Sequence, residues 1–389
     1  MIFEVATATK IVFGDGVVTR LGELARAIVG ADPEPIPALL VTGRDGARAG
    51  VARAALEDAR FALVAFEVHG EPTTDDASAA VLRAREKGVR AVIAVGGGSA
   101  IDLGKAVAAL VTHPGDPLDY LEVVGRGRPL VRDSLPFVAV PTTAGTGAEV
   151  TKNAVLCEPK TRVKVSMRSD RMLPRLALVD PELTLSVPPA VTAATGLDAL
   201  TQVIEPFVSC AASPFTDGLA REGIVRGARS LRTAFTRGDD REARRDLALT
   251  SLFGGLCLAN AKLGVVHGFA GPIGGAFDAP HGAICARLLP LAIEINVRAI
   301  RARGEPAMLA RFDELARLLT GRSEAIADDA VTFTDALVRD LAISRLSTYG
   351  VRESDVPGLV ERCERASSTK GNPILLERTE LSSLLMRAL

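Results

Sequence analysis

The sequence lacks an excess of charge of either sign. Its 389 residues include 46 Lys and Arg against 47 Asp and Glu, which gives a formal net charge of −1. Proteins that bind nucleic acids usually carry a basic excess or a basic stripe, so the composition argues against a nucleic-acid partner. Hydrophobic residues make up 48% of the chain and charged residues 24%, the composition of an ordinary globular protein.

Long apolar segments are also missing. The N-terminus has no basic region followed by an apolar core, so we expect no signal peptide. No stretch approaches 18 uninterrupted apolar residues, so we expect no transmembrane helix and no membrane partner.

Cysteine is scarce and widely spaced. None of the five cysteines forms a Cys-x-x-Cys pair, and their odd number and wide spacing argue against a disulfide framework. We therefore expect free thiols in a cytoplasmic protein. The cysteines are Cys157, Cys210, Cys257, Cys285 and Cys363.

The length exceeds that of one ordinary hydrophobic core, which predicts two domains. In the first half, short apolar runs alternate with stretches of helical spacing such as 76–87. Continuous apolar strands are typical of a parallel sheet that is buried on both faces. The pattern predicts an α/β nucleotide-binding domain over residues 1–187. The predicted strands are 38–42, 63–68, 92–95 and 137–140.

The strand signals stop after about Asp180, and Pro188-Pro189 interrupts the chain. The remaining residues have helical spacing almost to the end, so we predict an all-α domain over residues 188–389. The predicted helices are 190–208, 216–234, 241–261, 282–298, 306–319 and 325–342.

A glycine-rich loop, Gly96-Gly97-Gly98-Ser99, follows the predicted strand 92–95 and opens a helix. Glycines let a ligand approach the backbone, and a helix N-terminus attracts anions, so the loop suits a pyrophosphate. Asp102 lies in the first helical turn, where the helix dipole favours a carboxylate. The alternative is a tight turn without a ligand, since no Gly-x-Gly-x-x-Gly follows the first strand.

A second polar loop, residues 141–149, follows the predicted strand 137–140 and contains three threonines and two glycines. Ligands of open α/β sheets bind at the carboxyl ends of strands. Two such loops in succession favour a nucleotide-binding cleft.

Two of the four histidines, His267 and His281, are flanked by glycine and apolar residues, which predicts a buried setting. Asp198 and Gln202 are four residues apart and share one face of a helix. A buried carboxylate needs a partner, and a divalent cation held by Asp198, His267 and His281 would supply one. Spacing alone leaves this metal site and ordinary buried histidines both open.

Five stretches of the chain together resemble the iron-containing (group III) alcohol dehydrogenases along nearly its whole length. The resemblance implies a dehydroquinate synthase-like fold, a divalent metal and often a homodimer. The matching stretches are Phe13-Gly14, residues 96–102, residues 141–151, residues 196–199, and His267-Gly268 with Pro280-His281-Gly282.

The resemblance also implies metal ligands, namely one aspartate and three histidines. Asp198, His267 and His281 match three of these positions, and the fourth falls on Gln202. A further histidine of the family, close to the nicotinamide and substrate, is replaced by Gly271. We expect Gln202 to act as the fourth ligand, and we expect iron(II), with zinc as the alternative.

The cofactor contacts that the resemblance implies include glycines and hydroxyls of both loops. Many NAD-using relatives have aspartate where this chain has Gly43, followed by Arg44. Loss of the carboxylate removes a repulsion against a 2′-phosphate, and Arg44 can pair with that phosphate. In the alternative, Gly43 simply ends a strand and Arg44 is solvated, so we expect NAD or NADP. The other implied contacts are Gly97, Gly98, Ser99, Thr142, Thr143, Thr146 and Lys164.

These observations predict an NAD(P)-dependent oxidoreductase that interconverts a small alcohol and its aldehyde or ketone in an interdomain cleft. Asp198, His267 and His281 would hold a metal that polarises the substrate oxygen, and the cofactor would carry the hydride. One alternative is a metal-independent keto-acid reductase similar to maleylacetate reductase. Another is a catalytically silent nucleotide-binding protein.

Overall fold

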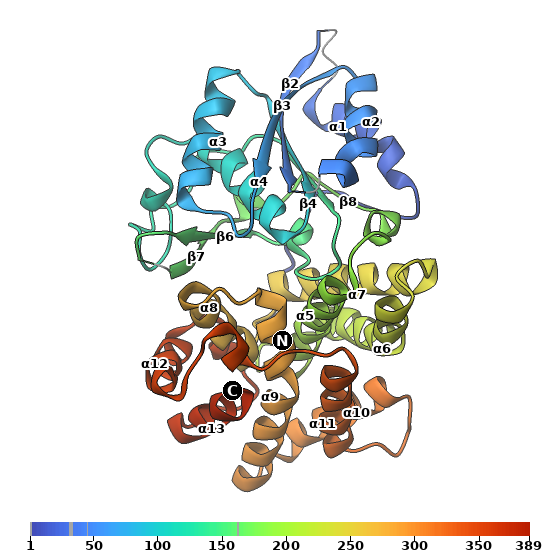
Figure 1. Cartoon of the computed structure of the whole chain (residues 1–389), viewed down its shortest axis with the longest axis vertical. Helices are drawn as coiled ribbons and strands as arrows, with labels where there is room; N and C mark the ends of the chain where they lie inside the picture. Colours follow the sequence, from blue (N-terminus) through green and yellow to red (C-terminus); the bar gives the residue numbers. More distant parts are fainter. Residues whose placement is uncertain (1, 31–33, 45, 162) are drawn as a thin grey trace. The chain divides into compact units, whose positions relative to one another are not determined.

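The computed structural model describes residues 2–30, 34–44, 46–161 and 163–389. The chain forms two compact units (Figure 1). The α/β unit comprises Val5–Thr143 and Gly147–Leu185. The helical unit consists chiefly of Ser186–Leu389 and includes the short loop segment Ala144–Thr146.

Within the described residues, the α/β unit is built on a six-stranded sheet of order β1-β8-β5-β4-β2-β3. Every strand pairing in this sheet is parallel. A separate antiparallel pair joins β6 (Asn153–Glu158) to β7 (Val163–Arg168). The strands of the sheet are β1 (Ile11–Phe13), β2 (Ile36–Gly43), β3 (Phe61–Val68), β4 (Ala91–Gly96), β5 (Phe137–Pro141) and β8 (Leu176–Val179).

Helices cover both faces of this sheet. Successive residues of a strand point to opposite faces. Accordingly, Leu39 and Val41 join the core formed with α3 (Thr74–Glu86) and α4 (Gly98–Leu110). Leu40, between them, joins the opposite core. That core is completed by α1 (Leu21–Val29) and α2 (Gly50–Asp58), on the other side of the sheet in Figure 1.

The helical unit is organised around α5 (Pro189–Val208), which contacts α6, α7 and α9. Most of α5 is buried, including the polar residues Asp198, Gln202 and Glu205 on one of its faces. The other helices are α6 (Pro214–Thr236), α7 (Arg241–Asn260), α8 (Val265–Ala276), α9 (His281–Arg303), α10 (Pro306–Thr320), α11 (Ala327–Asp340), α12 (Val356–Arg365) and α13 (Arg378–Ala388).

The predicted fold class, an α/β unit followed by an all-helical unit, is confirmed. The four predicted strands correspond to β2, β3, β4 and β5, and the six predicted helices to α5, α6, α7, α9, α10 and α11. Helix α8 is not among the predicted helices, because it contains several glycines and Pro272 and therefore has low intrinsic helix propensity.

Among the described helices, no single one is long and apolar enough to cross a membrane. The pair α7 and α8, bent by 97° at the break between them, meets that test by length and composition.

Candidate functional site

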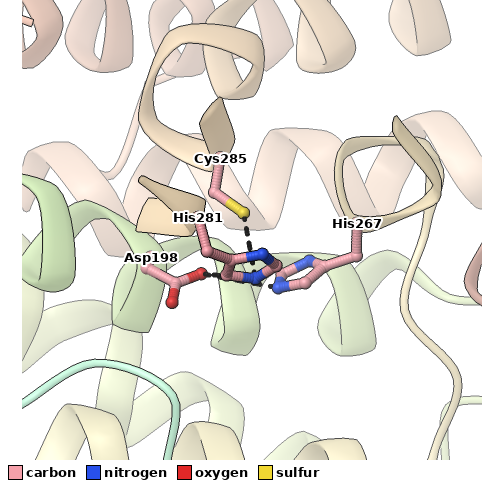
Figure 2. Close-up of side chains that lie close together, drawn as sticks. All are labelled: Asp198, His267, His281 and Cys285. Carbon is pink, nitrogen blue, oxygen red and sulfur yellow. Dashed lines mark hydrogen bonds and ion pairs between the residues drawn. The ribbon is translucent and has the colours of Figure 1, made fainter. Parts of the chain in front are cut away.

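Four side chains of the helical unit with metal-ligand chemistry converge (Figure 2). Asp198 comes from α5, His267 from α8, and His281 and Cys285 from α9. One ligand atom of each lies within 4.8 Å of those of the others. Asp198 Oδ1 is 3.5 Å from His267 Nε2 and 3.9 Å from His281 Nε2. We call these four residues the Asp–His–Cys cluster.

The local sequence explains this convergence. His281 is the first residue of α9, and Gly282 beside it allows α9 to approach α5. A Cβ at Gly282 would lie only 2.6 Å from the carbonyl oxygen of Ala194 on α5. A glycine at this position is therefore required to bring His281 next to Asp198.

The cluster contains polar atoms that need a partner. Asp198 is 1% exposed and His267 is 9% exposed. Among the described residues, neither Asp198 Oδ1 nor His267 Nε2 has a hydrogen-bond partner, although both atoms are buried. Each unsatisfied buried group costs about 1–3 kcal/mol. A cation bound between these two atoms would satisfy both, so the residues present fit a divalent metal.

The groups of the cluster shift one another's pKa values. Burial on its own would raise the pKa of Asp198, but His281 and His267 outweigh burial and lower it. Burial would likewise lower the pKa of His281, but its electrostatic interactions with Cys285 and Asp198 raise it to about 9. The pKa of His267 is raised well above its usual value despite burial, by Cys285 and Asp198 among other groups. In the metal-free protein, the imidazoles therefore hold protons where a metal would otherwise bind.

In the α/β unit, the predicted cofactor loops lie at one edge of the sheet. β2, β4 and β5 are parallel neighbours, so Gly43, the glycine-rich loop and Thr142 all follow the carboxyl ends of adjacent strands. The amide nitrogen of Thr142 donates to the carbonyl of Gly96 at 2.9 Å, which joins the two loops. This edge is where open α/β sheets bind their ligands.

At the start of α4, no side chain caps the backbone amides. Gly97 is the N-cap of this helix. A Cβ at Gly97 would lie 3.2 Å from Thr143 Oγ1, tighter than ordinary contact. The exposed backbone donors at such a helix start suit a phosphate group.

Comparison with known proteins identifies the family of the chain. The profile of the family described as iron-containing alcohol dehydrogenase matches residues 8–181, and that of the C-terminal region of the Fe-containing alcohol dehydrogenase family matches residues 192–389. The chain belongs to the iron-containing alcohol dehydrogenase family. It is therefore an oxidoreductase, and its architecture is that of the solved iron-type enzymes.

Relatives of this iron-type alcohol dehydrogenase cover most of its length. It is 41% identical over 301 residues to long-chain-alcohol dehydrogenase 1 of Geobacillus thermodenitrificans, spanning 76% of this chain and 73% of the relative. It is 33% identical to 1,3-propanediol dehydrogenase of Citrobacter freundii, spanning 97% and 96% of the two chains. A crystal structure of 1,3-propanediol oxidoreductase superposes with a TM-score of 0.91 at 31% identity and full coverage of both chains.

A carboxylate that was not predicted from the sequence, Glu205, supports the cluster from α5. Its Oε2 is 2.6 Å from His267 Nδ1, and its Oε1 accepts a 2.7 Å hydrogen bond from the amide nitrogen of Val266. The first bond fixes the imidazole so that Nε2 faces Asp198, an arrangement common behind metal-binding histidines. The seven-residue spacing from Asp198 places Glu205 on the same side of the helix and could have identified it.

The two positions where the family has histidine differ in their surroundings. Gln202 is 2% exposed, and its amide nitrogen donates to the carbonyl of Thr146 at 2.6 Å. That bond engages the nitrogen, and ligation through the amide oxygen stays a prediction. At Gly271, a Cβ would meet no atom of the described residues within 4 Å.

The remaining predicted cofactor residues have partners within their own units or lie at the surface. Lys164 on β7 has its Nζ 3.0 Å from Glu71 Oε1. Asp102 lies beyond the first turn of α4, so its predicted place in that turn is wrong. It accepts a 3.1 Å hydrogen bond from the amide nitrogen of Val155, which ties α4 to β6. Arg44 is exposed directly after β2. Thr146 belongs to the helical unit, whereas Thr143 belongs to the α/β unit.

Proposed function

We propose that this iron-type alcohol dehydrogenase interconverts a small alcohol and its aldehyde or ketone, using NAD(H) or NADP(H) and a divalent metal. The observation that carries the proposal is the buried pair Asp198 Oδ1 and His267 Nε2, which lie 3.5 Å apart without a hydrogen-bond partner, with His281 beside them. The names of the relatives, a long-chain-alcohol dehydrogenase and a 1,3-propanediol dehydrogenase, favour a primary alcohol.

Asp198, His267 and His281 would hold the metal, and Gln202 would face it from the same helix as Asp198. When bound, the metal supplies a Lewis acid that polarises the substrate oxygen. Glu205 keeps the proton of His267 on Nδ1 and so keeps Nε2 available as a ligand. Because Gly271 has no side chain, proton transfer falls to solvent or to the ribose hydroxyl of the nicotinamide nucleotide.

The cofactor would lie along the strand edge of the α/β unit. Backbone amides of Gly97, Gly98 and Ser99 at the start of α4 would bind the pyrophosphate. Thr142 and Thr143 would add hydroxyl groups, the family resemblance adds Thr146 and Lys164, and Asp102 lies on the helix that the glycine-rich loop opens. The absence of a carboxylate at Gly43 and the exposed Arg44 favour acceptance of NADP(H) as well as NAD(H). A related structure, sulfoacetaldehyde reductase from Bifidobacterium kashiwanohense, holds NAD+.

The test combines elemental analysis of the purified protein with a screen of NAD(P)H oxidation over small aldehydes, before and after chelation. We expect activity that chelation removes and added metal restores, and that Asp198→Ala abolishes. Full activity with no detectable metal would contradict the metal-assisted mechanism. Activity confined to acidic keto compounds after chelation would instead favour a reductase similar to maleylacetate reductase.

We also propose that the enzyme is a cytoplasmic homodimer. All five cysteines are free thiols, which suits a reducing compartment. Light scattering of the eluting protein in size-exclusion chromatography measures the mass, and a mass of one chain would contradict the dimer.

A further inference from the structure

We propose that Cys285 is a metal ligand of this enzyme, so that Asp198, His267, His281 and a thiolate surround the ion. Cys285 lies one helical turn after His281 on α9, and its side chain points into the cluster (Figure 2). This inference rests on the metal site of the proposed function, and it adds a ligand that the family resemblance does not supply.

Two of the distances within the cluster match those between ligands of a tetrahedral metal site. With Zn–S of about 2.3 Å and Zn–N of about 2.0–2.1 Å, a sulfur and a nitrogen ligand of one ion lie about 3.5–3.6 Å apart. Cys285 Sγ is 3.6 Å from His281 Nε2. Oxygen and nitrogen ligands would lie about 3.3–3.5 Å apart. Asp198 Oδ1 is 3.5 Å from His267 Nε2, which matches this value, and 3.9 Å from His281 Nε2, which is longer. All four ligand atoms lie within 4.8 Å of one another.

Cys285 is a stronger donor than Gln202. The amide nitrogen of Gln202 is bonded to the carbonyl of Thr146, which orients this end of the side chain toward the 144–146 loop segment. Its amide oxygen is neutral, whereas a coordinated thiol loses its proton and brings a full negative charge. Cys285 therefore compensates for the histidine that Gln202 replaces.

The other buried cysteines lack such surroundings. Cys363 on α12 belongs to the same hydrophobic core as Cys285, and its sulfur lies 3.6 Å from Thr369 Oγ1. Burial raises the pKa of Cys363 to about 12, and it raises that of Cys257 to about 12 as well. Both remain neutral thiols, which makes Cys363 a matched control for Cys285.

A thiolate in the ligand set changes which metal the site prefers. Soft sulfur ligands favour zinc, whereas sites with only nitrogen and oxygen ligands discriminate less. We therefore expect zinc to bind in preference to iron(II). Replacing the sulfur by oxygen in Cys285→Ser should reduce the ratio of zinc to iron(II) affinity by at least roughly tenfold.

The direct test is cobalt(II) added to the metal-free protein, since a thiolate bound to cobalt gives an intense sulfur-to-metal charge-transfer absorption in the near ultraviolet. We expect this band in the wild type and in the control Cys363→Ser, and its loss in Cys285→Ser. A band that persists in Cys285→Ser would overturn the inference. Cobalt that binds without the band would also overturn it but leave the metal site of the proposed function intact. Failure to bind cobalt at all would overturn both.

A second measurement needs no variant and therefore stands even if Cys285→Ser fails to fold. The wild-type protein is alkylated with and without bound zinc, and each cysteine is followed by mass spectrometry. We expect zinc to slow the modification of Cys285 strongly and to leave that of the exposed Cys210 unchanged. Equal rates at Cys285 with and without zinc would overturn the inference.

Discussion

Replacing Glu205 by glutamine removes one of two acceptors on which neighbouring donors depend. In the native protein, the carboxylate meets His267 Nδ1 at 2.6 Å and the amide nitrogen of Val266 at 2.7 Å. Glutamine offers one oxygen, so one of these two donors must face an amide NH2 group. The carboxylate also serves the N-terminus of α8, whose N-cap residue Gly264 has no side chain of its own.

The magnitude of the effect can be worked out from these contacts. Leaving a buried donor unsatisfied costs about 1–3 kcal/mol. If His267 loses its acceptor, the hydrogen bond at Nδ1 no longer fixes the orientation of the ring. We then expect the metal affinity to fall by roughly 10- to 100-fold. Each factor of ten corresponds to about 1.4 kcal/mol, so the two estimates agree. If Val266 loses its acceptor instead, the cost appears as a lower free energy of unfolding.

The assay is a competition titration of zinc between the protein and a chromophoric chelator, alongside thermal unfolding of both metal-free proteins. Glu294→Gln is the control, because Glu294 lies on α9 and pairs with Arg387 at the surface. We expect weaker zinc binding only in Glu205→Gln. Wild-type zinc affinity together with unchanged thermal stability would refute the assignment of Glu205 as the residue that positions His267.

Single sites in both units give four further predictions. Gly97→Val should abolish NAD(P)H binding, measured by fluorescence titration, because a side chain there meets Thr143. Zinc binding should be unchanged. Unchanged affinity for the cofactor would exclude this loop as the pyrophosphate site. Arg44→Ala should raise the Kd for NADP(H) more than that for NAD(H), and equal effects would refute the 2′-phosphate contact. Position 271 has room for a Cβ. If a histidine there restores a proton relay, Gly271→His should have a higher kcat at low pH than Gly271→Ala. Identical pH profiles of the two variants would argue against a relay at this position. Because the pKa of His281 is raised to about 9, metal affinity should fall as pH drops below that value, by up to about tenfold per pH unit for each proton displaced, which titrations at several pH values measure.

The sheet could be predicted from the sequence where its strands are long and buried on both faces. β2 and β4 are continuous apolar runs, and such runs have few other interpretations. β1 and β8 span only three and four residues and leave too short a pattern. β6 alternates buried and partly exposed residues, and its pairing with β7 depends on a packing against α4 that no local pattern reveals.

The site could be predicted only in part. Helical spacing shows which residues share a face of one helix, but it does not show which other residues pack against that face. Asp198 and Gln202 share a face of α5, as predicted, yet Gln202 meets the carbonyl of Thr146. Thr146 lies in a loop that follows a strand of the other unit, so its contact with α5 is a long-range tertiary contact that local sequence patterns do not reveal. Cys285 follows His281 at the same four-residue spacing, but its role depends on three helices meeting at one point.

The charges of the Asp–His–Cys cluster explain how the carboxylate of Asp198 and the imidazole of His267 can be buried together. Without metal, the pKa values of His267 and His281 are raised, so both imidazoles carry protons beside the carboxylate of Asp198. A divalent ion that displaces both protons leaves the sum of charges unchanged, since two positive charges replace two. The carboxylates of Asp198 and Glu205 therefore face positive charge with or without the metal, which avoids the uncompensated buried charge that costs most in a low-dielectric interior. A neutral glutamine at position 202 fits the proposed ligand set, because a metal-bound thiolate of Cys285 would supply a second negative charge beside that of Asp198.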